Sequence, residues 1–187
     1  MKLKLTVLFI ALALALTYFV FKKDIMSYQS VTPQDAPMSG ETITKQAVFN
    51  YFSSAALVDY QGVATSISSA DLQSSDRVIV HLWASWCAPC VNEVPDLIQF
   101  ATREVAKNSR KTIFIAVSLD EGAEELGKFL KSFPDFDAEP FRRVWDRGGG
   151  LAKLLNADRL PMTVMVFRDR AEVKVVRGVV DWKTVGD

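Results

Sequence analysis

The sequence predicts a protein of the α/β class, with a central mixed sheet flanked by helices. Strand-like and helix-like patterns alternate from residue 57 onward, which indicates helices packed on a sheet. The apolar run Arg77–Trp83 is nearly continuous, as is typical of a strand covered on both faces. Two later strand-like segments, 164–167 and 173–180, are separated by the polar turn 168–171, and we expect them to pair antiparallel.

The composition fits one globular domain behind a short N-terminal segment. The chain has 187 residues, of which 49% are hydrophobic, enough to build a buried core. Its 22 basic residues balance 22 acidic ones, and no basic stripe is visible in the sequence. We therefore expect no nucleic-acid partner.

The N-terminal segment, residues 5–21, is apolar and is bracketed by lysines. It is compatible with either a cleaved signal peptide or a retained signal anchor. The bulky residues 18–23 offer no small-residue cleavage site, so we favour a transmembrane signal anchor at residues 1–23. A polar linker at residues 24–48 then leads to a globular domain at residues 49–187.

Local patterns predict the elements of that domain. A short hairpin is expected at residues 57–60 and 63–67, followed by a helical turn capped by Ser68. The helix after Cys87 contains Pro95 and carries apolar side chains at helical spacing, namely Val91, Val94, Leu97, Ile98, Ala101 and Val105. Further strands are expected at residues 112–119 and 141–145, and further helices at residues 124–133 and 150–155.

Both cysteines of the chain, Cys87 and Cys90, stand two residues apart, directly after the strand Arg77–Trp83. We expect Cys87 to lie at the start of a helix, where unpaired backbone N–H groups and the helix dipole favour a thiolate and lower the pKa of the thiol. Cys87 is therefore the expected nucleophile, and Cys90, one turn deeper, the resolving thiol. Pro89 suits the first helical turn because it has no N–H to leave unpaired. A structural zinc site is not expected, because His81 is the only histidine.

The motif Trp86-Cys87-Ala88-Pro89-Cys90 after a hydrophobic strand resembles the thioredoxin superfamily. The longer run 80–90, with Glu93 and Pro95, resembles its TlpA/ResA/DsbE-like branch of membrane-anchored thiol–disulfide oxidoreductases, and the resemblance covers residues 52–182. It implies a thioredoxin-like fold with an N-terminal β-hairpin extension. Such folds usually close with a C-terminal helix, which we expect here to be short or missing because seven residues follow Val180.

The same resemblance implies residues of a substrate groove. The proline that opens the penultimate strand of thioredoxin-like proteins is cis and faces the cysteines, a position that Pro161 fills here. Its neighbour Leu160 would offer backbone groups to an extended peptide. Trp86, expected to cover the cysteine pair, and Pro89 complete the predicted substrate-binding set.

Three further polar features each have two interpretations. Glu93, three residues after Cys90, is either an acid–base group for the buried thiol, as the resemblance implies, or an ordinary first-turn glutamate. His81 stands where thioredoxins have a buried aspartate, and we interpret it as a structural residue rather than a proton relay. The acidic residues Asp120, Glu121, Glu124 and Glu125 are interpreted as a solvated helix start.

These observations predict a membrane-anchored, extracytoplasmic thiol–disulfide oxidoreductase with no cofactor beyond the Cys87–Cys90 disulfide. The resemblance implies protein disulfide or dithiol substrates, apocytochrome c among them, and recharging by a membrane electron donor. It also places the protein in the bacterial inner membrane as a single-pass protein, with its domain in the periplasm. Two alternatives stay open at this stage, a non-enzymatic binding module with a thioredoxin-like fold and a copper-delivery protein.

Overall fold

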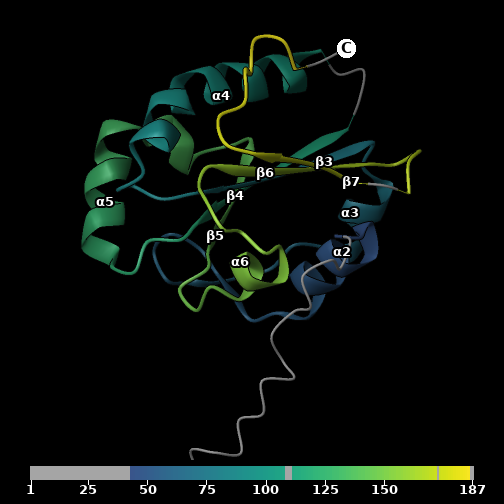
Figure 1. Cartoon of the computed structure of the whole chain (residues 1–187), viewed down its shortest axis with the longest axis horizontal. Coiled ribbons are helices and arrows are strands. Elements are labelled where there is room, and N and C mark those ends of the chain that lie inside the picture. Colours follow the sequence, from purple (N-terminus) through teal and green to yellow (C-terminus); the bar gives the residue numbers. More distant parts are fainter. Residues whose placement is uncertain (1–42, 108–110, 172, 186–187) are drawn as a thin grey trace, which may run out of the picture. The chain divides into compact units, whose positions relative to one another are not determined.

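The computed structural model describes residues 43–107, 111–171 and 173–185. Its centre is a five-stranded sheet with the strand order β5-β4-β3-β6-β7 (Figure 1). β3, β4 and β5 run parallel, β6 is antiparallel to β3, and β7 is antiparallel to β6. The predicted mixed sheet is thus confirmed. The strands are β3 (Arg77–Trp83), β4 (Thr112–Ser118), β5 (Phe141–Trp145), β6 (Met162–Phe167) and β7 (Val173–Arg177).

Helices cover both faces of the sheet (Figure 1). One face carries α4 (Ala88–Ala106), α5 (Ala123–Ser132) and the 3₁₀ helix η2 (Pro134–Asp137). The other face carries α2 (Lys45–Ser54), α3 (Ser69–Ser74) and α6 (Gly150–Leu154).

The central strand β3 contributes to both cores. All seven of its residues are buried, with Ile79 and Trp83 in the core under α4 and Val78, Val80 and Leu82 in the opposite core. This two-sided burial explains why its sequence is a continuous apolar run instead of an alternating one. The strand prediction for Arg77–Trp83 is confirmed at both ends.

The domain begins earlier than predicted, because α2 starts at Lys45, inside the segment that we assigned to the linker. The Thr44 side chain caps this helix by accepting a hydrogen bond from the Ala47 N–H at 3.1 Å. Val48, Phe49 and Phe52 are buried in the core on its inner side. The remaining linker and the predicted anchor lie outside the described residues. Within the residues that the structure does describe, no helix is long and apolar enough to cross a membrane.

The predicted hairpin is present but shorter than expected, with β1 (Leu57–Val58) paired antiparallel to β2 (Ala64–Thr65). The chain leaves the ladder at Asp59, whose Oδ1 accepts hydrogen bonds from the N–H groups of Gln61 and Val63, both at 2.9 Å. This side chain organises the connecting loop and ends the strand pairing early.

Two predicted features near the ends of α4 and β7 have different outcomes. Val105, expected to face the core, is 51% exposed, while Phe100 and Glu104 are buried instead. Glu104 forms a buried ion pair with Arg77, which explains how a charged residue replaces the expected apolar one.

No helix forms between β7 and residue 185, which agrees with the expected short or missing C-terminal helix; Val180 and Trp182 of this segment are buried under α4.

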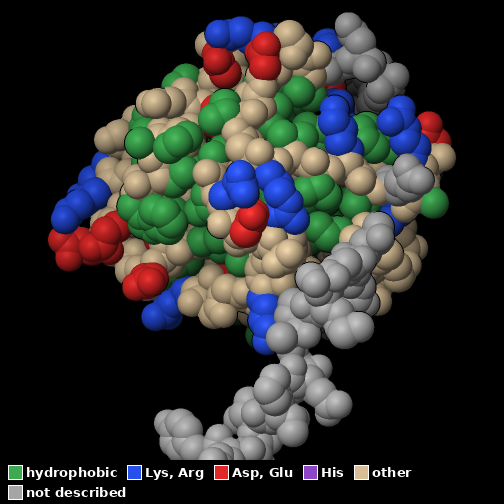
Figure 2. All heavy atoms as spheres, in the orientation of Figure 1, with side chains coloured by type: hydrophobic (Ala, Val, Ile, Leu, Met, Phe, Trp, Pro, Cys, Tyr) green, Lys and Arg blue, Asp and Glu red, His purple; other side chains and the backbone are tan. Residues whose placement is uncertain are grey.

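Charged side chains of both signs are mixed on the face shown in Figure 2, where blue basic groups lie beside red acidic ones. Among the surface ion pairs of the described residues, Asp158 lies 3.1 Å from both Arg159 and Arg177.

Candidate active site

The two cysteines form a disulfide at the N-terminus of α4, with an S–S length of 2.04 Å and a Cα–Cα distance of 5.3 Å. Cys87 is the N-cap residue, with an extended backbone, and its Sγ accepts a hydrogen bond from the Cys90 N–H at 3.3 Å. Cys87 keeps 6% of its surface exposed, whereas Cys90 has none. The predicted placement of Cys87 at the start of the helix and of Cys90 one turn deeper is confirmed, and Cys87 is the more exposed residue of the two.

The turn before Cys87 is held by Asp120, which follows β4 and is 1% exposed. Both of its carboxylate oxygens accept hydrogen bonds from the Ser85 N–H at 3.1 Å, Oδ1 accepts from Ser85 Oγ at 2.6 Å, and Oδ2 accepts from Ser118 Oγ at 2.8 Å. Our interpretation of Asp120 as part of a solvated helix start was therefore wrong, although Glu124 and Glu125 do lie in the first turn of α5. The sequence carries no local signal for this long-range contact.

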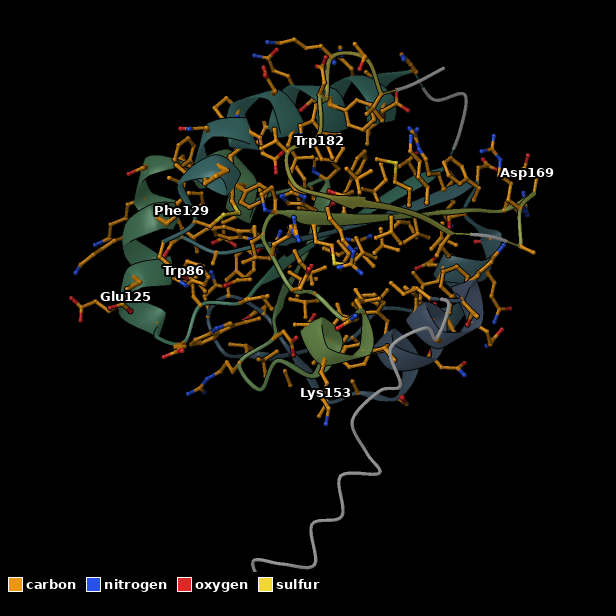
Figure 3. The ribbon with its side chains drawn as sticks, in the orientation of Figure 1. Trp86, Glu125, Phe129, Lys153, Asp169 and Trp182 are labelled. Atoms are coloured by element: carbon orange, nitrogen blue, oxygen red, sulfur yellow. A yellow bond between two sulfur atoms is a disulfide. The ribbon has the colours of Figure 1, made fainter. Side chains whose placement is uncertain are left out.

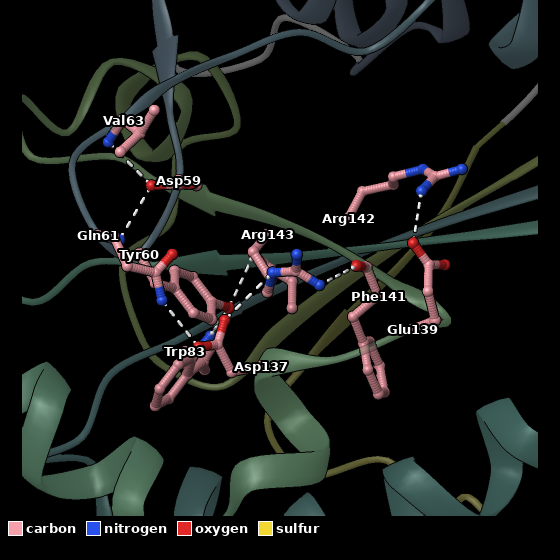
Figure 4. A network of polar contacts seen from close by, with 11 residues as sticks. Asp59, Tyr60, Gln61, Val63, Trp83, Asp137, Glu139, Phe141, Arg142 and Arg143 are labelled. Atoms are coloured by element: carbon pink, nitrogen blue, oxygen red, sulfur yellow. Dashed lines mark hydrogen bonds and ion pairs between the residues drawn. The ribbon is translucent and has the colours of Figure 1, made fainter.

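Trp83, the last residue of β3, is fixed from the hairpin side (Figure 4). Its Nε1–H donates to the Tyr60 hydroxyl at 2.9 Å, and that hydroxyl donates to the Ala116 carbonyl at 2.9 Å. The ring of Phe129 on α5 packs against the indole at a centroid distance of 4.5 Å. Figure 4 also shows Arg143 beside Asp137 at 3.1 Å, so polar contacts continue across this end of the sheet.

A second polar cluster lies behind the cysteines, between α4 and the sheet. Glu93 is 4% exposed, and its Oε2 accepts hydrogen bonds from the Val180 N–H at 3.0 Å and from Trp182 Nε1–H at 3.2 Å. Figure 3 shows Trp182 lying between α4 and the strands. The other carboxylate oxygen of Glu93, Oε1, lies 3.3 Å from Nε2 of His81 on β3. The interpretation of Glu93 as an ordinary first-turn glutamate was therefore wrong, because Glu93 lies beyond the first turn of α4 and is buried.

Burial dominates the electrostatics of this cluster. It raises the pKa of Glu93 from 4.5 to about 7, against the opposing hydrogen bonds from Val180 and Trp182. It lowers the pKa of His81 from 6.5 to about 3. Near neutral pH, His81 is uncharged and Glu93 is poised between its two protonation states. Glu93 follows Cys90 by three residues on α4, so it lies about one helical turn from the resolving cysteine. Its hydrogen-bond donors Val180 and Trp182 belong to the same buried cluster as Cys90.

Leu160 and Pro161, two of the residues predicted to line a substrate groove, lie at the end of the sheet that carries the cysteines. The Leu160–Pro161 peptide bond is cis, as the resemblance implied. The register that pairs Leu82 with Met162 places Pro161 beside the end of β3, at the same edge of the sheet as the cysteines. Pro161 is buried and Leu160 is half-buried.

Three exposed residues close in sequence to the cysteines or to the end of β7 are apolar. Trp86 is 67% exposed, and Val179, which follows β7, is 58% exposed. Pro89 is also exposed. The assignment of these residues to substrate binding stays a prediction. Among the described residues, no group of three or more His, Cys, Asp or Glu side chains is arranged to hold a metal ion.

A Cys-x-x-Cys disulfide that caps the helix after the central strand, beside a cis-proline that opens an antiparallel strand, defines a thioredoxin-fold protein with a redox-active site. Residues 42–187 match the family model described as Redoxin, and the chain therefore belongs to the Redoxin family of the thioredoxin superfamily.

Curated relatives agree with this assignment. The thiol-disulfide oxidoreductase ResA of Bacillus thuringiensis subsp. konkukian is 23% identical over 120 residues, which cover 62% of this chain and 65% of ResA. The chain thus spans slightly less than two thirds of that relative. Thioredoxin 1 of Plasmodium falciparum is 30% identical over 99 residues, which cover 51% of this chain and 85% of the thioredoxin.

Solved structures share the fold. MTB dsbF superposes with a TM-score of 0.56 at 19% identity, covering 70% of this chain and 89% of dsbF. StoA from Bacillus subtilis superposes with a TM-score of 0.53 at 22% identity, covering 70% of this chain and 92% of StoA. These likenesses establish the thioredoxin-like fold.

Proposed function

We propose that this protein is a thiol–disulfide oxidoreductase that exchanges disulfides with protein substrates through Cys87 and Cys90. One observation carries the proposal: the two cysteines form a disulfide at a helix N-terminus, where Cys87 keeps a small exposed surface and Cys90 is fully buried. A thiolate at Cys87 is stabilised by the amide groups of the first turn, and a thiolate is the nucleophile in disulfide exchange.

In the reducing direction, the Cys87 thiolate attacks one sulfur of a substrate disulfide. The S–S bond of the substrate breaks, a mixed disulfide forms on Cys87, and the released substrate sulfur takes up a proton from solvent. Cys90 then loses its proton and attacks the Cys87 sulfur, which releases the second substrate thiolate, itself protonated from solvent. The substrate gains two electrons and two protons, and the enzyme dithiol becomes the Cys87–Cys90 disulfide. The oxidising direction runs through the same steps in reverse.

Glu93 is the proposed acceptor of the Cys90 proton. Its carboxylate accepts hydrogen bonds from Val180 and Trp182, which belong to the same buried cluster as Cys90. Its pKa of about 7 allows it to take up a proton in one step and release it in another near neutral pH. Solvent has no comparable access to Cys90, because that residue is fully buried.

The substrate peptide is proposed to lie along the rim formed by Leu160, Pro161, Trp86 and Pro89. Trp86 offers a large exposed apolar surface, and exposed aromatic side chains are frequent anchors in protein recognition. Leu160 precedes the cis-proline in the loop that leads into β6, and its backbone groups would pair with an extended peptide.

The cellular setting is part of the same proposal. The apolar residues 5–21 support a membrane-anchored protein whose domain acts outside the cytoplasm, in the periplasm of a bacterium. Apocytochrome c, with its paired thiols, is a candidate substrate, and a membrane electron donor would recharge the protein. A topology reporter fused after residue 187 tests the orientation, and activity of a periplasm-dependent reporter is the expected result.

The activity is tested with a disulfide-linked peptide whose two halves carry a fluorophore and a quencher. The wild-type chain with a chemical reductant should restore fluorescence, and Cys87→Ser should lose this turnover entirely. Cys90→Ser is the matched control, because it retains the nucleophile and should accumulate a stable mixed disulfide detectable by mass spectrometry. Turnover in Cys87→Ser equal to the wild type would overturn the proposal.

A further inference from the structure

His81 and Glu93 form a buried pair whose facing atoms have incomplete hydrogen bonding. The distance between His81 Nε2 and Glu93 Oε1 is 3.3 Å, and neither atom makes a well-aligned hydrogen bond to any of the described residues. The other polar atom of each side chain does have a hydrogen-bond partner. His81 Nδ1 lies 3.0 Å from Thr163 Oγ1, and Glu93 Oε2 accepts hydrogen bonds from Val180 and Trp182 of the C-terminal segment.

The chemistry of imidazole gives this pair two complementary arrangements. When Glu93 is ionised, Oε1 needs a donor, and His81 provides one if its proton is on Nε2, while the Thr163 hydroxyl donates to Nδ1. When Glu93 is protonated on Oε1, it needs an acceptor, and His81 provides one if its proton is on Nδ1, with Thr163 as the acceptor there. In both arrangements the imidazole is neutral and each facing atom has a partner.

We propose that His81 is a positioning residue that changes tautomer when Glu93 gains or loses its proton. The proton that enters the pair resides on Glu93. The neutral imidazole carries one proton in both end states, on Nε2 beside the carboxylate and on Nδ1 beside the carboxylic acid, and the Thr163 hydroxyl is the donor to Nδ1 in the first state and the acceptor in the second. No charge is placed on the imidazole at any stage. A buried polar group without a hydrogen-bond partner destabilises the fold, so the tautomer change keeps Glu93 able to titrate inside the core.

The surroundings favour a neutral imidazole over an ion pair. Strand neighbours of His81 are Ala116 on β4 and Thr163 on β6, neither of which is charged. The charged groups on α4 and the C-terminal segment lie outside the pair: Arg103 donates to the Trp182 carbonyl at 3.4 Å, and Lys183 pairs with Asp96 at 3.1 Å near the surface. Burial lowers the pKa of His81 to about 3, which agrees with a residue that stays uncharged.

This inference rests on the proposed function, in which Glu93 accepts the proton of Cys90. It adds that each proton transfer to Glu93 is matched by a tautomer change at His81. An aspartate or other carboxylate at position 81 could not follow the change in this way, because a carboxylate without a proton only accepts hydrogen bonds.

The test uses the fact that His81 is the only histidine in the chain. Full-length protein with ¹⁵N- and ¹³C-labelled histidine is studied by NMR from pH 5 to pH 9, as a disulfide and after reduction. In the disulfide form, the ring nitrogen shifts should change from an Nδ1–H to an Nε2–H imidazole with a midpoint near the pKa of Glu93, about 7, and show no imidazolium signal. One tautomer at every pH, or formation of the imidazolium in this range, would overturn the inference.

Two variants sharpen the result. Glu93→Gln should hold His81 in a single tautomer across the range, whereas the exposed Glu121→Gln should retain the change. A tautomer change that persists in Glu93→Gln would assign the switch to another group and contradict the proposal. The NMR measurement needs no turnover, so a switching His81 in a protein that fails the peptide-disulfide assay would refute only the proposed function, and an active protein with a fixed His81 would refute only this inference.

Discussion

Replacing Glu93 with glutamine should remove a pH-dependent loss of stability. The pKa of Glu93 is 4.5 in its ordinary state and about 7 in the folded protein, because burial disfavours the carboxylate. The folded chain therefore holds this proton more tightly than the unfolded chain does. Stability from this group is fully present below pH 4.5, decreases as the pH rises through 7, and is then constant. At about 1.4 kcal/mol per pH unit, the loss is about 3 kcal/mol.

Glutamine at this position reproduces the protonated form of the acid. Its carbonyl oxygen can accept from Val180 and Trp182, as Oε2 does, and its amide can donate to Nε2 of His81. We therefore expect Glu93→Gln to match the wild type near pH 4.5 and to be more stable by about 3 kcal/mol at pH 8.

Urea unfolding of the disulfide form, followed by tryptophan fluorescence at a series of pH values, measures this difference. The exposed Glu121→Gln is the matched control and should follow the wild-type curve. Parallel curves for Glu93→Gln and the wild type between pH 4.5 and 8 would refute the assignment of a raised pKa to Glu93.

Three further substitutions test the surrounding structure. Asp120→Asn should lower the unfolding free energy by about 1–3 kcal/mol, because a buried acceptor of the active-site turn is lost, while the exposed Asp135→Asn should have no effect in the same urea assay. Trp182→Phe removes a donor that lowers the pKa of Glu93, so the midpoint of the stability–pH curve should move upward. Trp86→Ala should leave the unfolding midpoint nearly unchanged and raise KM for a protein disulfide; an unchanged KM would contradict its role in the rim.

Sequence patterns were sufficient wherever local chemistry determines the structure. The strand Arg77–Trp83 is recognisable because burial on both faces makes its sequence almost entirely apolar, with Arg77 and His81 as the exceptions. The placement of Cys87 at a helix start followed from a strand that ends in a Cys-x-x-Cys motif with Pro89 in the first turn. The cis bond before Pro161 was accessible only through the family resemblance.

Long-range contacts account for what the sequence did not reveal. Asp120, which follows β4, accepts a hydrogen bond from Ser85, which follows the neighbouring strand β3. Glu93 contacts His81 and Trp182 only when α4, β3 and the C-terminal segment pack together. No spacing within the chain encodes these distances. The start of the helix at Lys45 was assigned to the linker because it continues a polar segment that contains Pro33, Pro37 and Gly40 and few apolar residues.

The central claim is that the N-terminus of α4 makes Cys87 a reactive thiolate and leaves Cys90 protected. Its most direct test is the rate of iodoacetamide alkylation of the fully reduced chain as a function of pH, with each cysteine quantified by mass spectrometry. Cys87 should react first, with a midpoint well below the value of about 8.5 for a free cysteine, while Cys90 stays unmodified. A Cys87 rate that rises only above that value, or faster labelling of Cys90, would contradict the account.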